Sequence, residues 1–249
     1  MIQSFPTADA LADAVAHHIA ACAREAISTR GRFIVALSGG STPRAAYSRL
    51  ATRDSRLATD DWHLTHILWG DERCVPPDDP RSNYRMAKEV LLDRVPIPAE
   101  QIHRIRGEDE PEGAARDYER ELHSLLGSRG APAGLDLVLL GLGEDGHTAS
   151  LFPGQPSVHE TKRWAVAVLA PDRKLWRVTL TPAILNQASN VTFVVSGANK
   201  AQTLQRVLEQ PFDPDAVPAQ AIRPIHGRVI WMVDQAAAGR LEGLVTRDS

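Results

Sequence analysis

A histidine in a glycine-rich segment is the residue of this chain best suited to proton transfer. Residues 141–150 read Gly-Leu-Gly-Glu-Asp-Gly-His-Thr-Ala-Ser and follow the apolar run 135–140. The glycines permit a sharp turn at the carboxyl end of a strand, where open α/β sheets place their ligands. An unperturbed imidazole titrates near pH ~6.5. We therefore expect His147 to act as a general base, and we expect a helix to begin beside it.

Two carboxylates next to this histidine argue against a nucleotide site. Three glycines of the segment match the dinucleotide pattern G-x-G-x-x-G, but Glu144 and Asp145 would place negative charge where a pyrophosphate lies. Either carboxylate could orient the ring of His147 and stabilise an imidazolium. The sequence leaves the choice between Asp145 and Glu144 open.

A second segment has the composition of an anion-binding loop. Ser-Gly-Gly-Ser-Thr-Pro at 38–43 follows the apolar run 33–37, and Thr42 and Pro43 suit the N-cap and first position of a helix. Glycines before a helix N-terminus let backbone N–H groups approach an anion. No Gly-Lys-Ser/Thr follows, and Ala36 replaces the first glycine of G-x-S-x-G, so a Walker loop and a serine nucleophile are excluded. We expect the phosphate of a small molecule to bind Ser38, Gly39, Gly40, Ser41 and Thr42.

Two cations are further candidates for anion binding. Lys200 ends Ser-Gly-Ala-Asn-Lys, which follows the apolar run 191–195 and opens a helix. A cation in a first helical turn opposes the helix dipole by about 0.3–1 kcal/mol, unless an anion lies between them. Arg177, at the start of Arg-Val-Thr-Leu-Thr-Pro, is the second candidate. The alternative for both is a solvated surface side chain.

A third cluster of polar residues follows the apolar run 64–69. Asp71, Glu72 and Arg73 come directly after it, and Arg-Ser-Asn-Tyr stands at 81–84. Arg73 could hold a phosphate or carboxylate through two hydrogen bonds. Asp71 could bind sugar hydroxyls, orient Arg73 or assist proton transfer, and Asn83 opens a helix that it could cap. A solvated strand end is the alternative.

The elements that must position these residues alternate along the chain. Short apolar runs separated by amphipathic stretches predict an α/β fold with a mainly parallel sheet, formed by one domain over 1–249. A small strand-rich appendage is expected around 160–181, and surface loops at 75–82 and 210–218. We expect strands at 33–37, 64–69, 135–140, 164–169, 177–180, 191–195 and 229–233, and helices at 7–28, 43–53, 82–93, 111–127, 182–188, 199–209 and 234–243.

Composition excludes several classes of protein. The 249 residues include 28 Lys and Arg against 31 Asp and Glu, a balance that argues against a general nucleic-acid binder. No apolar run approaches the roughly 20 residues that cross a bilayer, and the first Lys or Arg is Arg24, so we expect neither membrane insertion nor a basic leader. Two cysteines form no disulfide framework, and neither CxxC nor HExxH is present, so no metal site is expected. We expect a cytoplasmic protein.

The motifs together resemble the 6-phosphogluconolactonase family, within the glucosamine-6-phosphate deaminase/isomerase-like superfamily. They are SGGSTP (38–43), WGDER (69–73) with RSNY (81–84), GLGEDGHTASLFP (141–153), RVTLTP (177–182) and SGANK (196–200). The resemblance implies a three-layer fold with a mostly parallel Rossmann-like sheet and helices on both faces. It also implies hydrolysis of 6-phospho-D-glucono-1,5-lactone to 6-phosphogluconate, in the pentose phosphate pathway, without a cofactor.

The resemblance also assigns roles. It makes His147 the general base, Asp71 and Arg73 its acidic and arginine partners, and the loop 38–42 with Arg177 and Lys200 the phosphate site. Arg81 is a third arginine that could share this work, and the resemblance does not divide the work among them.

Two alternatives accompany the resemblance. Related deaminases pair the histidine with a glutamate shortly downstream, whereas Phe152 stands five residues after His147 here and cannot relay protons. This difference disfavours an isomerase or deaminase. The other alternative is a non-catalytic sugar-phosphate sensor. A sensor would need an output module such as a helix-turn-helix, and the sequence offers no basic helix for one. The oligomeric state is not determined.

Overall fold

A mostly parallel sheet with helices on both faces forms the body of the protein. The computed structural model describes residues 1–52, 57–127 and 134–241. Six strands pair in the order β1-β9-β8-β5-β2-β3, and every neighbouring pair is parallel. The three-layer α/β arrangement is therefore confirmed. Their bounds are β1 Ile2–Phe5, β2 Phe33–Leu37, β3 Thr65–Trp69, β5 Leu137–Leu140, β8 Asn190–Val195 and β9 Arg228–Asp234.

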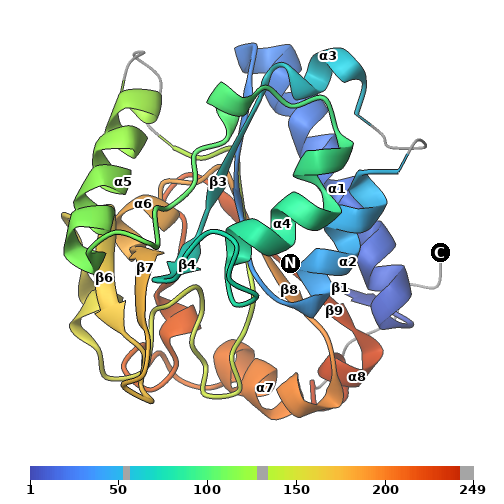
Figure 1. Ribbon diagram of the computed structural model, residues 1–249. Helices are drawn as coiled ribbons and strands as arrows, with labels where there is room; N and C mark the ends of the chain where they lie inside the picture. The colour runs from blue at the N-terminus through green and yellow to red at the C-terminus, as the bar shows by residue number, and fades with distance from the viewer. Residues whose placement is uncertain (53–56, 128–133, 242–249) are drawn as a thin grey trace.

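The helices lie on the two faces of this sheet. In Figure 1, α1 and α2 lie on one side of β3 and α5 on the other. Helix α1 begins where the sequence predicts, since the Thr7 hydroxyl accepts a hydrogen bond from the Ala10 amide at 3.1 Å. Its apolar stripe is buried, including Cys22. The helices are α1 Ala8–Arg30, α2 Ser41–Leu50, α3 Thr59–Trp62, α4 Asn83–Val90, α5 Pro111–Leu126, α6 Pro182–Leu185, α7 Ala201–Glu209 and α8 Gln235–Ala238.

A small antiparallel sheet packs beside the main one. It has the order β4-β7-β6, with β4 Asp71–Arg73, β6 Ala165–Leu169 and β7 Trp176–Leu180. Its apolar side chains Ala165, Val178 and Leu180 belong to the same buried cluster as the main sheet. The strand-rich appendage expected around 160–181 is therefore present, and β4 joins it from elsewhere in the chain.

Some elements differ from the expectations. The seven expected strands are present within two residues at each end, but β1, α3 and β4 were missed because each has only three or four residues. The helices expected at 182–188 and 234–243 end early, at Leu185 and Ala238, and 82–93 divides into α4 and the 3₁₀ helix Leu92–Arg94. Residue 53 and residues 242–243 of the expected helices lie outside the described residues.

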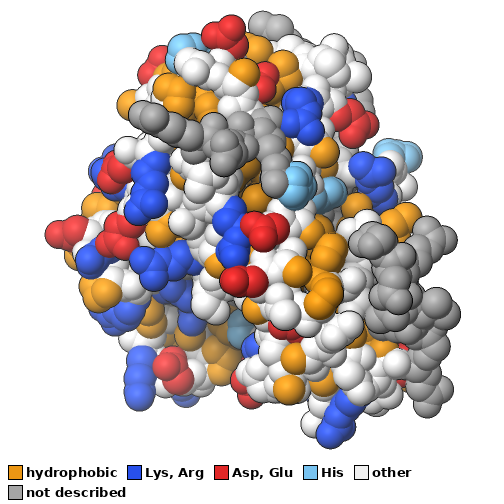
Figure 2. Space-filling model, turned by 90° about the vertical axis from the view of Figure 1, so that its right-hand side faces the viewer, with side chains coloured by type: hydrophobic (Ala, Val, Ile, Leu, Met, Phe, Trp, Pro, Cys, Tyr) orange, Lys and Arg blue, Asp and Glu red, His pale blue; other side chains and the backbone are white. Residues whose placement is uncertain are grey.

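The surface agrees with the balanced charge of the sequence. Figure 2 shows Lys and Arg side chains interspersed with Asp and Glu on the face that it presents. Within the described ranges, no helix is long and apolar enough to cross a membrane.

The strand order sets where side chains can meet. The segments that follow β8, β5, β2 and β3 all leave the same edge of the sheet, because parallel neighbours end together. Connections run in opposite directions on either side of the β5–β2 pair, which makes this pair the switch point of the topology. Open α/β sheets bind their ligands outside the carboxyl ends of strands at such a point.

Candidate active site

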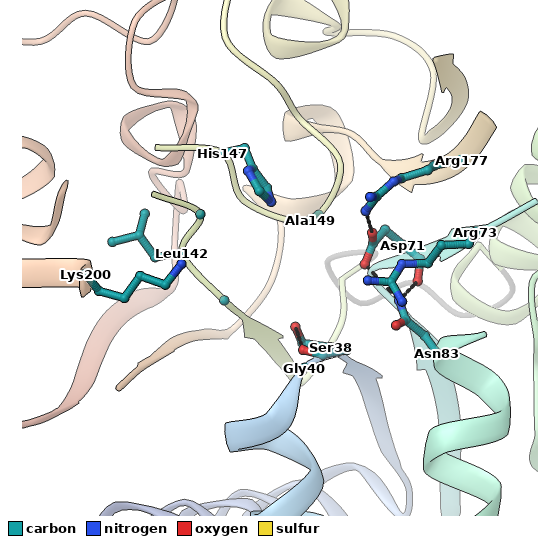
Figure 3. A pocket seen from close by; sticks show the side chains of 13 residues that line it. Ser38, Gly40, Asp71, Arg73, Asn83, Leu142, His147, Ala149, Arg177 and Lys200 are labelled. Atoms are coloured by element: carbon teal, nitrogen blue, oxygen red, sulfur yellow. Dashed lines mark hydrogen bonds and ion pairs between the residues drawn. The ribbon is translucent and has the colours of Figure 1, made fainter. Parts of the chain in front are cut away.

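A polar pocket of about 200 Å³ lies at this switch point. Its lining comes from the segments that follow β2, β5 and β8, from β4 and β7 of the small sheet, and from the start of α4. Figure 3 shows the labelled side chains around the pocket. Nine of the thirteen residues singled out in the sequence line it, including His147 and the two loop glycines. The lining residues are Ser38, Gly39, Gly40, Asp71, Arg73, Asn83, Gly141, Leu142, Gly143, His147, Ala149, Arg177 and Lys200.

The loop after β2 forms the floor of the pocket in Figure 3. Helix α2 begins at Ser41 with Gly40 as its N-cap, so the expectation that Thr42 caps the helix and Pro43 starts it is wrong. The physical reason is Gly40, whose φ of 109° turns the chain into the helix two residues earlier. Ser41 and Thr42 do not line the pocket. No side chain caps the first turn of α2, so its amides remain available to an anion.

Close packing explains the first glycine of this loop. A Cβ atom on Gly39 would lie 2.0 Å from the side-chain oxygen of Asn83. The hydroxyl of Tyr47 donates to the carbonyl of Ser38 at 3.0 Å and accepts from its amide at 2.9 Å. The side chain of Tyr47 on α2 therefore holds the loop in place through Ser38, and Gly39 lets the loop contact Asn83 at the start of α4.

The ring of His147 projects into the pocket (Figure 3). Its Nδ1 lies 2.6 Å from Oδ1 of Asp145, which also accepts the His147 amide at 3.1 Å. Burial opposes ionisation of Asp145, but these hydrogen bonds outweigh it and lower the pKa of Asp145 to about 2. The carboxylate therefore fixes the proton of the neutral ring on Nδ1, which leaves the lone pair on Nε2.

The glycines around His147 have steric causes. A Cβ atom on Gly143 would lie 2.1 Å from Nδ1 of His147, and Gly146 has a φ of 93°. The amide of Gly143 donates to the carbonyl of His147 at 2.8 Å, closing a tight loop. The expectation of a helix at this position is wrong, because residues 141–155 form turns and loops rather than a helix.

Glu144 faces away from the histidine. Its carboxylate accepts from Nδ2 of Asn199 at 2.6 Å and lies 4.0 Å from Nζ of Lys200. Its carbonyl accepts from the Thr203 hydroxyl at 2.6 Å. Glu144 thus connects the segment 141–150, here called the histidine loop, to the start of α7. Of the two carboxylates that the sequence offered as orienting groups, Asp145 is the one in contact with the ring.

Asp71 is a buried carboxylate in the wall of the pocket. It is 6% exposed, and its Oδ2 accepts from the Ser150 hydroxyl at 2.6 Å. Nδ2 of Asn83 donates to the backbone carbonyl of Asp71 at 2.9 Å and to its Oδ1 at 3.3 Å. Ser150 belongs to the histidine loop, so this contact fastens that loop to β4.

Arg73 and Arg177 lie side by side because they are register partners of β4 and β7. Partners in an antiparallel pair lie on the same face, so both guanidinium groups reach the pocket. An Arg177 Nη atom lies 3.8 Å from Oδ2 of Asp71. Burial lowers the pKa of Arg177, and the charge of Asp71 opposes this shift. The guanidinium group of Arg177 thus pairs with Asp71, and that of Arg73 lies beside it. Two cations on one wall of the pocket favour an anion or polar oxygens there.

Arg81 lies outside the pocket. Its exposed side chain forms two hydrogen bonds to the carboxylate of Asp79, at 2.9 and 2.7 Å, and only its carbonyl approaches the site, by accepting from Arg73 at 2.6 Å. The structure therefore does not bring Arg81 to the pocket lining, and its role in ligand binding stays a prediction. Asn83 begins α4 as expected, but Ser82 caps it, since the Ser82 hydroxyl accepts from the Arg85 amide at 3.1 Å.

Sequence reasoning assigned no role to Glu72, which supports the side of the pocket that Arg73 and Arg177 form. Its carboxylate is 2% exposed and accepts from the amides of Arg73, Asn83 and Tyr84 at 2.7–2.8 Å. It also accepts from the Ser82 hydroxyl at 2.9 Å. Burial raises the pKa of Glu72, and these four donors oppose the shift. A buried carboxylate at the start of α4 joins that helix to β4. The only sign of this role in the sequence was that Glu72 stands between two charged residues directly after an apolar run.

Lys200 enters the pocket from the opposite side to Arg73 and Arg177, with the loop after β2 between them in Figure 3. It ends the 3₁₀ helix Ala198–Lys200 and forms the N-cap of α7, close to the expected start at residue 199. Its side chain is 23% exposed. No cluster of three or more His, Cys, Asp or Glu suited to a metal ion occurs in the described part of the chain.

A cation-lined pocket at the switch point of a parallel sheet defines a Rossmann-like α/β protein whose site suits a small anionic ligand. Residues 6–231 match the family model described as glucosamine-6-phosphate isomerases/6-phosphogluconolactonase. The chain belongs to this family.

Several relatives carry a more specific name. The chain is 43% identical to the 6-phosphogluconolactonase of Nostoc sp. over 218 residues, covering 87% of this chain and 88% of the relative. It is 37% identical to that of Haemophilus influenzae over 235 residues, covering 94% and 97%. Among solved structures, 6-phosphogluconolactonase from Trypanosoma brucei superposes with a TM-score of 0.84 at 31% identity, covering 97% of this chain and 98% of the other.

Proposed function

We propose that this chain is a 6-phosphogluconolactonase that hydrolyses 6-phospho-D-glucono-1,5-lactone to 6-phosphogluconate, with His147 as the general base. The names of the relatives support the lactone substrate, and its place in the pentose phosphate pathway is part of the proposal. One observation carries the role of the histidine: its ring, held at Nδ1 by Asp145, faces the same pocket as the glycine loop and the cations. A base and an anion-binding loop within one small pocket suit a phosphorylated sugar lactone.

The neutral imidazole would activate water. Nε2 of His147 removes a proton from a water molecule as the water oxygen attacks C1 of the lactone. Asp145 stabilises the imidazolium that forms. The tetrahedral intermediate then collapses, the bond from C1 to the ring oxygen breaks, and the imidazolium returns its proton to that oxygen. The products are the open-chain acid and the neutral ring of His147.

The charged groups would hold the two ends of the substrate. The phosphate lies on the amides of the loop 38–42, between Lys200 and Arg177, because the loop lies between these cations. Asp71 accepts hydrogen bonds from sugar hydroxyls. Arg73, or free amides of the histidine loop, would donate to the oxyanion that develops on the lactone carbonyl.

The general base, the oxyanion donor and the phosphate-binding groups need to supply only a moderate rate enhancement. A general base supplies about 10²–10⁴ and one oxyanion donor about 10²–10³. Binding of the remote phosphate adds positioning of C1 against the activated water. This total suits an activated ester that also hydrolyses without a catalyst.

A direct assay tests the proposal. Glucose 6-phosphate is oxidised to the lactone in situ, and 6-phosphogluconate formation is followed with and without the protein. We expect hydrolysis to accelerate in proportion to the protein concentration. A rate equal to spontaneous hydrolysis at every protein concentration would overturn the proposal. Incubation with glucosamine 6-phosphate and measurement of ammonia tests the rival deaminase activity, which we expect to be absent because Phe152 stands five residues after His147.

The remaining expectations stay predictions. These are a cytoplasmic location, a single domain over 1–249 and no role for nucleic acid. The rice relatives that match this chain are named chloroplastic.

A further inference from the structure

One aromatic side chain touches residues on both sides of the pocket. The ring of Phe152 lies 4.9 Å from that of His147, centroid to centroid, at an angle of 50°. The guanidinium carbon of Arg177 lies 5.5 Å from the centroid of the Phe152 ring. This distance is within the range of a cation–π contact. Phe152 does not line the pocket, so it reaches a ligand only through these two neighbours.

Arg177 has few other contacts that fix its guanidinium group. Its ion pair with Asp71 spans 3.8 Å, which is too long for a hydrogen bond. Its Nε is buried and has no hydrogen-bond partner among the described residues. The face of the Phe152 ring is therefore a main restraint on where this guanidinium group lies.

The ring of Phe152 is itself firmly held. It is 3% exposed and packs with Val168 and Ala170 in a small apolar cluster that is separate from the main core. Val168 belongs to β6, which pairs with β7, the strand that carries Arg177. The histidine loop and the small sheet are thus joined through this side chain.

We propose that Phe152 is a positioning residue that sets the place of Arg177 relative to His147, and thereby aligns the bound lactone with its base. The proposal rests on the function proposed above. It also gives a reason for an apolar ring at this position: a flat surface contacts an imidazole and a guanidinium group at once, without competing for their hydrogen bonds.

The test is the substitution Phe152→Leu, which keeps an apolar side chain but removes the ring face. A misplacement near 1 Å can cost about a hundredfold in rate, so we expect kcat/KM to fall at least about tenfold, with a higher KM and a lower kcat. Val166→Ala is the matched control, because Val166 packs against the same cluster but its register partner is Thr179 rather than Arg177. We expect its kcat/KM to stay within about threefold of the unmodified protein.

A double-mutant cycle separates positioning from general damage. In an Arg177→Ala background, Phe152→Leu should raise KM much less than it does alone, because the group that it positions is gone. Thermal unfolding checks that each variant folds, and Phe152→Met replaces the leucine variant should that one fail to fold.

Three outcomes would overturn the proposal: full activity in folded Phe152→Leu, equal loss in Val166→Ala, or multiplicative effects with Arg177→Ala. Failure of the proposed function can be distinguished from failure of this proposal, because the unmodified protein would then show no lactonase activity. In that case the NMR signals of the Arg177 guanidinium and the His147 ring still decide the matter. They should both change in Phe152→Leu and stay unchanged in Val166→Ala.

Discussion

Oδ1 of Asp145 lies 2.6 Å from Nδ1 of His147, on a loop whose backbone brings the two side chains together within three residues. The same oxygen accepts the amide of His147, so one carboxylate fixes both the ring and the chain that carries it. The imidazole keeps Nε2 free to accept a proton, and its ring points into the pocket. The predictions for this site start from that pair.

Replacement of the base should remove turnover and retain binding. We expect His147→Ala to lower kcat at least about a hundredfold, since general base catalysis contributes about 10²–10⁴. Affinity for 6-phosphogluconate, measured by calorimetry, should change far less. Unchanged turnover would show that another group activates water.

Asp145→Asn tests the role of the carboxylate. The pKa of Asp145 is lowered to about 2, so the group is ionised throughout the neutral range. An amide in its place can donate to Nδ1 and so favour the wrong tautomer of His147. We expect kcat to fall about tenfold or more, with little change in KM. Glu144→Gln is the matched control, because Glu144 does not touch the ring, and a similar loss there would contradict the assignment.

Lys200→Ala tests the phosphate site. Removal of this cation should weaken binding of 6-phosphogluconate much more than binding of gluconate, which lacks the phosphate. Competition against the lactonase reaction measures both affinities. Equal losses for the two ligands would place the phosphate elsewhere in the pocket.

His66 on β3 should make stability depend on pH. Burial, followed by the charges of His103 and Arg32, lowers the pKa of His66 from 6.5 to about 4. The unfolded chain thus takes up a proton below about pH 6.5, while the native protein does so only near pH 4. The stability that neutral His66 contributes is complete above pH 6.5 and is lost as the pH falls toward 4.

Urea unfolding at pH 7 and pH 5 measures this effect. The free energy of unfolding should fall between the two values, and His66→Gln should reduce the fall. His17→Gln, on the exposed face of α1, is the control and should leave the difference unchanged. A fall that is the same in all three proteins would assign the pH dependence to other groups.

Much of the site could be predicted because its motifs are local. Glycines, a histidine and a carboxylate within residues 141–147 define one tight loop, and steric fit within that loop explains why they are glycines. The loop 38–40 likewise combines two glycines with the start of a helix. Short-range geometry of this kind depends on nearby residues, so it can be inferred from the residue types alone.

The arginines were harder to assign for a physical reason. Arg81 looked equivalent to Arg73 in the sequence, yet Asp79 two residues away holds its side chain outside the pocket. Arg73 and Arg177 are more than a hundred residues apart, and only the pairing of β4 with β7 brings them together. A strand of three charged residues carries no apolar pattern that would predict it.

The amino-acid sequence by itself determined the order of the longer strands and helices, without β1, α3 and β4. It also determined the two glycine loops and the chemistry that each can perform. The tertiary structure decided which charges face the ligand, because this depends on strand order and register across distant segments. It also decided that Asp145, and not Glu144, holds His147, since Asn199 and Lys200 from the start of α7 draw Glu144 away. Local steric fit determines the conformation of each loop, whereas the packing of the whole chain determines which side chains from distant segments face that loop across the pocket.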